Sequence, residues 1–316
     1  MNLEKVEQIA KAVLYEGYML YPYRPSSVKN RQRFNFGVLY PKAYSVAQEG
    51  TDACSLRTEC LICGDENTRC EARIRFLHLQ TRLSNGTSRW QETVEREVSL
   101  PQYALEQLCG RTLRHAFAFP DKNEVGRSRG QYQREPVEGI VELSARKISN
   151  GGFIVSVNLQ NITQLENPAT SRDAALVRSL VSAHVILGLK GGEFVSLLEP
   201  PESLREMAQS CQNVGVWPVL VGDPGQRDTM LASPIILYDY PKIAPESAGD
   251  LFDGTEIDEI LSLRIMTLTD EEKEELRQSD ERARQILERT ESMPAEQFMK
   301  LHGALRQLRP TQEDIP

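Results

Sequence analysis

The residues best suited to chemistry are four cysteines in one short stretch: Cys54, Cys60, Cys63 and Cys70. Cys60 and Cys63 form a C-x-x-C-G sequence with Gly64, and thiolates at this spacing can share one tetrahedral zinc ion. Cys54 and Cys70 lack the spacing of a second such pair. In a β-strand, moreover, Cys60 and Cys63 point to opposite faces and cannot bind one metal together. Two interpretations therefore stay open: a zinc or iron site, or cysteines that serve as small hydrophobic residues.

The chain also has four histidines, His78, His115, His184 and His302. His78 lies in an alternating strand pattern and His184 begins an apolar run, so both are read most simply as packed residues. Nucleophilic catalysis needs a nucleophile within reach of a base, and no G-x-S-x-G, H-E-x-x-H or Walker sequence accompanies these histidines. The sequence therefore does not indicate a conventional hydrolase or nucleotide-dependent enzyme. His78 is kept as a substitute ligand for the cysteine site.

Positive and negative charge are separated along the chain. A basic, aromatic segment near the amino end contains Tyr21, Tyr23, Arg24, Lys29, Arg31 and Arg33. An acidic, proline-containing segment contains Tyr238, Asp239, Tyr240, Asp250, Asp253, Glu256 and Asp258. A basic aromatic loop can bind phosphates or an acidic protein surface, and an acidic segment can bind a basic one. These are our candidate partner-binding residues. The simpler interpretation is that the two segments pair with each other or stay solvated.

Composition narrows the class of protein. The 316 residues include 37 Lys and Arg against 45 Asp and Glu, which gives a net charge of −8 and argues against a nucleic-acid-binding protein. With 40% hydrophobic and 26% charged residues, the composition is that of a globular protein with a core. No apolar run reaches the roughly 20 residues that span a membrane, and the amino end has no signal-peptide pattern. We therefore expect a cytoplasmic protein without membrane insertion.

The elements that position these residues are expected in four segments. Residues 1–34 are predicted to contain an amphipathic helix over Leu3–Glu16, followed by the basic aromatic loop. Residues 35–167 are predicted to form an antiparallel β domain. Residues 168–261 are predicted as a mixed α/β segment that ends in an irregular ordered strap, and residues 262–316 as a helical carboxyl-terminal region. The expected fold class is therefore α+β.

Two hairpins are predicted within the β domain. The first has its turn at Gly64–Thr68, between alternating runs over Glu59–Cys63 and Ala72–Leu79. The second has its turn at Asn150-Gly-Gly, which also separates two runs with alternating apolar positions. Between the hairpins, the polar stretch Gly110–Pro136 is predicted to be a long surface loop.

Three stretches together carry a resemblance to a known family: Leu14–Asn30, Trp217–Gly222 and Ser233–Leu261. The third, which contains Tyr-Asp-Tyr-Pro-Lys-Ile-Ala-Pro-Glu, is the most specific. The chain resembles, over nearly its whole length, a bacterial family that we associate with the gene clusters of uptake nickel-iron hydrogenases. The resemblance implies an accessory or assembly role, with a hydrogenase subunit or maturation factor as the partner. It implies no catalytic residues.

Two functions from different classes follow. The first is a non-catalytic accessory or assembly protein that binds a protein partner through the basic loop and the acidic strap. The second is a metal-binding protein or metalloenzyme that holds zinc or iron with Cys54, Cys60, Cys63 and Cys70. We favour the first, because of the resemblance and because the sequence carries no catalytic motif.

Overall fold

A computed structural model describes most of the chain and divides it into two compact units. The described residues are 3–15, 36–84, 88–125, 131–148, 152–242 and 265–278, with a few positions between 284 and 294. Residues 1–18 and 32–242 belong to the first unit, and residues 19–31 and 243–316 to the second. The boundary predicted after residue 167 falls inside the first unit.

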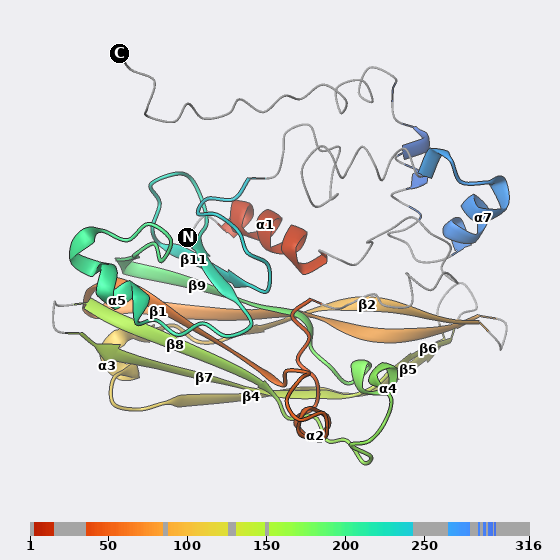
Figure 1. The fold of residues 1–316 in the computed structure, drawn as a ribbon, viewed down its shortest axis with the longest axis horizontal. Coiled ribbons are helices and arrows are strands. Elements are labelled where there is room, and N and C mark those ends of the chain that lie inside the picture. Colours follow the sequence, from red (N-terminus) through yellow and green to blue (C-terminus); the bar gives the residue numbers. More distant parts are fainter. Residues whose placement is uncertain are drawn as a thin grey trace. The chain divides into compact units, whose positions relative to one another are not determined.

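The described part of the first unit is built on an antiparallel sheet of eleven strands (Figure 1). Its main path runs β10-β11-β9-β1-β8-β7-β4, and β2, β3, β5 and β6 pair beside this path. The strands are β1 (Ser55–Ser84), β2 (Ser88–Ser99), β3 (Tyr103–Ala104), β4 (Leu113–Phe119), β5 (Lys122–Val125), β6 (Gln131–Arg134), β7 (Val137–Lys147), β8 (Gly152–Asn161), β9 (Val181–Phe194), β10 (Trp217–Leu220) and β11 (Thr229–Ser233). The helices of this unit are α1 (Leu3–Tyr15), α2 (Lys42–Ala47), α3 (Leu105–Leu108), α4 (Arg172–Leu176), the 3₁₀ turn η2 (Glu202–Leu204) and α5 (Arg205–Gln209). The antiparallel β part of the predicted α+β fold is therefore confirmed, and it extends through β9, β10 and β11 into the segment that was predicted as mixed α/β.

Strand β1 organises the sheet because it changes partners along its length. Its first half pairs with β8, and its second half pairs with β9 on one edge and β2 on the other. The first predicted hairpin is wrong: the runs Glu59–Cys63 and Ala72–Leu79 both belong to β1. Instead of a turn, residues 65–68 form a bulge opposite Gly191 of β9.

Turn chemistry inside this bulge explains the error. The Oδ1 atom of Asp65 accepts hydrogen bonds from the N–H groups of Asn67 (2.8 Å) and Thr68 (2.9 Å), which is an Asx turn. The Thr68 hydroxyl donates to the carbonyl of Gly191 at 2.9 Å. A Cβ at Gly192 would lie 2.6 Å from the Thr68 Cγ2, so the close approach requires glycine there. Residues that favour a hairpin turn thus hold a bulge in a continuous strand.

We expect Asp65→Ala to lower the free energy of unfolding by about 1 kcal/mol, because two backbone N–H groups lose their acceptor. Chemical denaturation measures this change. The matched control is Glu66→Ala, which removes an exposed pair with Lys147 and is expected to change stability by less than about 0.5 kcal/mol. Equal losses in the two variants would show that the Asx turn does not stabilise the bulge.

The second predicted hairpin is confirmed, since β7 and β8 pair from Lys147↔Phe153 to Gly139↔Asn161.

The predicted loop over Gly110–Pro136 is wrong, because β4, β5 and β6 lie within it. In β4 the residues alternate between half-buried and exposed, so the period-two pattern was present but masked by its polar, Arg-rich surroundings. Strands β9, β10 and β11 join the same sheet as β1 and β8.

The main core covers the inner face of the sheet. It includes buried residues of β1, β7, β8 and β9, and the helix α3 contributes Leu105 and Leu108. The buried ring of Phe76 lies 5.9 Å from that of Phe117 and 5.8 Å from that of Phe119. Because Phe76 is on β1 and the other two are on β4, the sheet curls to bring β4 against the second half of β1.

Two smaller clusters cover the outer face. The helix α1, which confirms the amphipathic helix predicted over Leu3–Glu16, lies across β9 and β11 in Figure 1. It packs Val6, Ile9, Ala10 and Val13 against Ile186, Val219, Val221 and Leu231. Near α5, Ala208 packs with Leu61 of β1 and Ile154 of β8.

The described part of the second unit contains α7 (Asp270–Gln278). Thr269 and Glu272 form a reciprocal capping box: Thr269 Oγ1 accepts from the Glu272 N–H at 3.3 Å, and Glu272 Oε2 accepts from the Thr269 N–H at 2.9 Å. Much of the helical region predicted over residues 262–316 lies outside the described residues. Among the helices that are described, none is both long and apolar enough to cross a membrane.

Candidate functional site

Most of the predicted partner-binding residues lie outside the described part of the chain. They are Tyr21, Tyr23, Arg24, Lys29, Arg31, Arg33, Asp250, Asp253, Glu256 and Asp258. The described part of the predicted strap is Pro234–Lys242, which follows β11 and includes Tyr238, Asp239 and Tyr240. We call this nine-residue segment the strap.

Side chains of the strap alternate between the protein and solvent. Ile235 and Leu237 pack against the cluster formed by α1, β9, β10 and β11. Ile236 and Tyr238 point outward, with exposed fractions of 72% and 87%. This alternation is that of an extended chain, whose successive side chains point to opposite sides.

Asp239 fastens the strap to the sheet. Its Oδ1 atom accepts a hydrogen bond from the Leu220 N–H at 2.7 Å, and its Oδ2 atom accepts one from the Ser196 hydroxyl at 2.5 Å. The N–H of Tyr240 donates to the Leu220 carbonyl at 2.7 Å. The strap is therefore held against β10 and against the segment that follows β9. The carboxylate of Asp239, predicted to bind a partner, is bonded within the chain instead.

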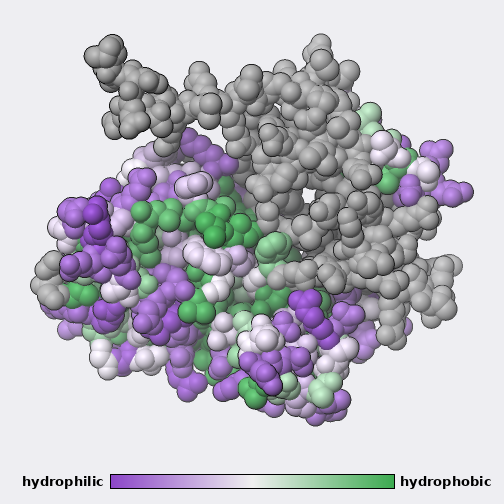
Figure 2. Space-filling view, in the orientation of Figure 1, coloured by the Kyte–Doolittle hydropathy of each residue, from purple (hydrophilic) through white to green (hydrophobic). Residues whose placement is uncertain are grey.

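Three large hydrophobic side chains are exposed near this attachment: Leu198, Ile236 and Tyr238. Leu198 lies beside it because its N–H donates to the Ser196 hydroxyl oxygen at 3.2 Å. Figure 2 shows that hydrophobic surface is also visible on the viewed face in the region of β9 and β11. We call Leu198, Ile236 and Tyr238 the strap surface. Exposed apolar side chains mark interaction sites where they form one contiguous patch.

The structure does not assemble the alternative metal site. Cys60 and Cys70 are buried, Cys63 is exposed and Cys54 is half-buried. Cys60 enters the main core, and Cys63 is three residues further along β1, where strand geometry turns its side chain to the other face. Within the described residues, no group of three or more His, Cys, Asp or Glu side chains could hold a metal ion, His78 included.

Burial also disfavours the thiolate form of Cys60, Cys70 and Cys211. It raises the pKa of Cys70 to about 12 and that of Cys211 to about 11, and it raises the pKa of Cys60 further. Because the thiolate is the nucleophile, these cysteines stay protonated and inert at neutral pH. Cys60 and Cys70 serve as small hydrophobic residues of the main core, which agrees with the second interpretation for these two of the four cysteines.

His78 and His184 are buried neutral residues. Burial lowers the pKa of each to about 4. His78 Nε2 donates to the Glu135 carbonyl at 2.8 Å, and His184 Nδ1 donates to the Ser182 carbonyl at 3.0 Å. His115 is hydrogen-bonded to the Tyr103 hydroxyl at 3.0 Å. None of these contacts places a histidine beside a serine, threonine or cysteine side chain.

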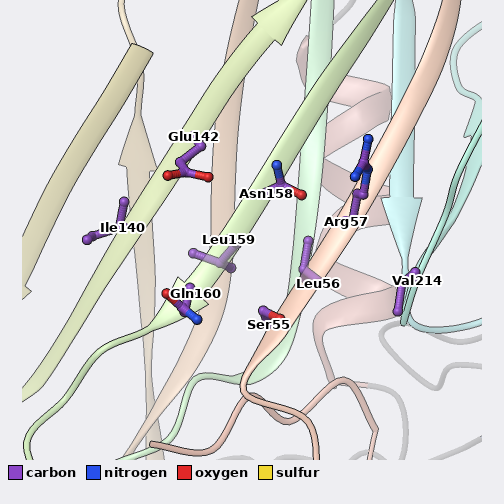
Figure 3. A pocket seen from close by; sticks show the side chains of 9 residues that line it. All are labelled: Ser55, Leu56, Arg57, Ile140, Glu142, Asn158, Leu159, Gln160 and Val214. Atoms are coloured by element: carbon purple, nitrogen blue, oxygen red, sulfur yellow. The ribbon is translucent and has the colours of Figure 1, made fainter. Parts of the chain in front are cut away.

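A groove with a volume of about 410 Å³ crosses the outer face of β1, β8 and β7 (Figure 3). Its floor is made of cross-strand rows, of which one contains Arg57, Asn158 and Glu142 side by side. The full lining is Ser55, Leu56, Arg57, Ile140, Glu142, Asn158, Leu159, Gln160 and Val214. Sequence reasoning missed this groove, because eight of its nine residues come from three strands that only the register of the sheet joins, and Val214 reaches it through an isolated bridge to Arg57.

The charged groups of the groove are already paired. Arg57 Nη2 lies 2.6 Å from Glu59 Oε1, and Arg114 Nε lies 3.1 Å from Glu142 Oε1. The groove therefore offers amides and paired charges for hydrogen bonding, and its geometry does not bring a general acid and a general base together.

No protein-family model and no curated protein matches the chain. One solved structure, the open-gate secretin InvG of the Salmonella SPI-1 type III secretion injectisome (residues 176 to the end), aligns at 8% sequence identity with a TM-score of 0.14. The alignment covers 60% of this chain and 60% of that secretin chain. A TM-score this low does not indicate a shared fold.

Proposed function

We propose that the chain is a non-catalytic accessory or assembly protein of the cytoplasm, which binds a protein partner through the strap surface. The observation that supports this proposal is that Tyr238 and Ile236 stay exposed although the strap is fastened by Asp239. A segment that is already ordered loses little conformational entropy on binding. Tyrosine is also among the residues enriched at binding hot spots.

The partner class comes from the sequence. The resemblance to a family associated with uptake nickel-iron hydrogenase gene clusters supports a hydrogenase subunit or maturation factor as the partner. Binding without turnover is supported by the chemistry of the described residues, in which buried thiols are protonated and buried histidines are neutral.

We expect the double variant Ile236→Ser plus Tyr238→Ala to weaken partner binding at least tenfold, because it removes both outward-facing side chains of the strap. Its free energy of unfolding should change by less than about 0.5 kcal/mol, since neither side chain is buried. To test this, the unmodified chain is co-expressed with hydrogenase subunits and maturation factors, and the protein that copurifies with it is identified. The Kd of that protein is then measured for the unmodified chain and for the double variant.

The control for this experiment is Val46→Ser on α2, which removes a side chain of 70% exposure elsewhere on the surface. It should leave the Kd unchanged. An unchanged Kd in the double variant would exclude the strap surface as the binding site. If no hydrogenase subunit or maturation factor is retained by the unmodified chain, the assigned partner class is wrong.

A further inference from the structure

The inner face of the sheet changes from apolar to cationic along β1. Phe76 ends the run of core side chains on this strand, and His78 is the next inward-facing residue. Arg96 of β2 lies directly opposite Phe76 in the register, and its guanidinium stacks over the Phe119 ring at 4.6 Å from the centroid. Arg134 comes from β6, which pairs with the end of β1. We call His78, Arg96 and Arg134 the arginine cluster.

The acids of this region are bonded to other groups. Glu92 accepts hydrogen bonds from Arg82 at 3.5 Å and from the Gln80 amide at 3.4 Å. The carboxylate of Glu135 is paired with Arg178 at 2.9 Å. Neither acid therefore has its charge directed to the arginine cluster.

Two guanidinium charges of the cluster are left without a counter-charge. Among the described residues, no carboxylate lies within ion-pair distance of Arg96 or Arg134. The Nε–H groups of both arginines are buried and have no hydrogen-bond acceptor. Arg134 donates only to a neutral group, the Gln80 amide oxygen, at 3.4 Å. Both side chains are half-buried, and a buried donor without an acceptor is costly, so the arrangement suits an anion that supplies acceptors for the two Nε–H groups and a counter-charge for the two guanidinium groups.

His78 contributes a buried hydrogen-bond acceptor that has no donor. Its ring is fully buried, and because Nε2 donates to the Glu135 carbonyl, the neutral ring presents an unprotonated Nδ1. This Nδ1 atom is buried and has no partner. The pKa of His78 is lowered to about 4 by burial, and the charges of Arg96 and Arg134 act in the same direction, so Nδ1 needs a hydrogen-bond donor at neutral pH.

We propose that the arginine cluster is a binding site for inorganic hydrogen phosphate. This ion carries two negative charges, which match the guanidinium groups of Arg96 and Arg134, and one hydroxyl, which can donate to Nδ1 of His78. Sulfate has the same shape and charge but no hydroxyl, and a carboxylate has neither the second charge nor the donor. The site goes beyond the proposed function, because its residues lie on β1, β2 and β6 and not on the strap (Figure 1).

The test is isothermal titration calorimetry of the full chain at pH 7.5 with inorganic phosphate, sulfate and methyl phosphate as separate probes. Phosphate is expected to bind at least tenfold more tightly than sulfate. Arg96→Gln and Arg134→Gln should each weaken the binding of both ions at least tenfold. His78→Phe should remove the preference for phosphate over sulfate. The control Arg114→Gln, which alters an exposed arginine on the outer face of β4, should change nothing.

Several results would overturn the proposal. Absence of phosphate binding, or unchanged affinity in Arg96→Gln and Arg134→Gln, would exclude the site. Equal affinity of the unmodified chain for phosphate and sulfate would exclude the role of His78, and this comparison needs no variant and so does not depend on the folding of His78→Phe. Methyl phosphate has largely lost its hydroxyl proton at this pH, so equal or tighter binding of methyl phosphate would exclude hydrogen phosphate as the specific ligand.

Discussion

Between pH 6.5 and pH 4 the free energy of unfolding is expected to fall by several kcal/mol, because His78 and His184 are buried in their neutral form. Burial lowers the pKa of each to about 4, whereas an unfolded histidine has a pKa of about 6.5. In this interval the unfolded chain binds protons that the folded chain does not bind. The contribution of the two histidines to the free energy of unfolding is therefore fully present above about pH 6.5 and is lost as the pH falls. Each histidine lowers the free energy of unfolding by at most about 1.4 kcal/mol per pH unit.

The variant His184→Gln isolates one of these two contributions. Glutamine does not titrate, and its side-chain amide can donate to the Ser182 carbonyl as the Nδ1–H group does now. The charged neighbours of His184, Arg75 and Glu97, are present in both proteins, so their titration cancels in the comparison. Urea denaturation at a series of pH values measures the slope of unfolding free energy against pH. We expect the slope between pH 6.5 and 4.5 to be smaller in the variant by up to about 1.4 kcal/mol per pH unit, which corresponds to the uptake of one proton.

Identical slopes in the two proteins would mean that His184 takes up its proton equally well in the folded chain. Burial would then not disfavour the charged form of His184. A lower stability of the variant at pH 7 does not affect the test, because only the dependence on pH is compared.

Local sequence patterns predicted the parts of the fold that depend on local geometry. The Asn150-Gly-Gly turn and the alternation around it predicted the β7–β8 pair, and the spacing of Val6, Ile9 and Val13 predicted α1. The bulge in β1 was misread because Asp65 and Thr68 make the same local hydrogen bonds that a hairpin turn would use. Only the pairing with β9, more than one hundred residues further along the chain, shows that β1 continues.

The contacts that hold the described part of the strap were not predicted from the sequence. Proline-bounded alternation indicated an ordered strap, and in its described part Tyr238 is exposed; a binding role for Tyr238 stays a prediction. Nothing near Asp239 in the sequence shows that its carboxylate is bonded to Leu220 and Ser196. The arginine cluster was missed for the same reason, since its three residues come from three strands and meet only through the curvature and register of the sheet.

The second large effect is expected at Glu59, whose carboxylate is buried on the outer face of β1. Its Oε1 accepts from Arg57 at 2.6 Å, and its Oε2 accepts from the backbone N–H of Gln212 at 2.8 Å. Arg146 lies further away, at 3.8 Å from Oε2. Glu59→Ala removes the acceptor of a partly buried N–H group and leaves a cavity, so we expect a loss of about 2–4 kcal/mol in the free energy of unfolding.

The matched control is Glu142→Ala, which removes a half-exposed carboxylate from the same face of the sheet, paired with the exposed Arg114. It should cost less than about 0.5 kcal/mol, because solvent screens the pair.

A second variant tests the cause of the Glu59 effect. Asn213 accepts hydrogen bonds from the Thr58 hydroxyl at 2.8 Å and from the Glu59 N–H at 3.0 Å, so it fastens the same segment to β1. If Glu59 acts by anchoring this segment, Asn213→Ala and Glu59→Ala together should cost clearly less than the sum of the two single losses, whereas strict additivity would mean that the two residues stabilise the fold independently.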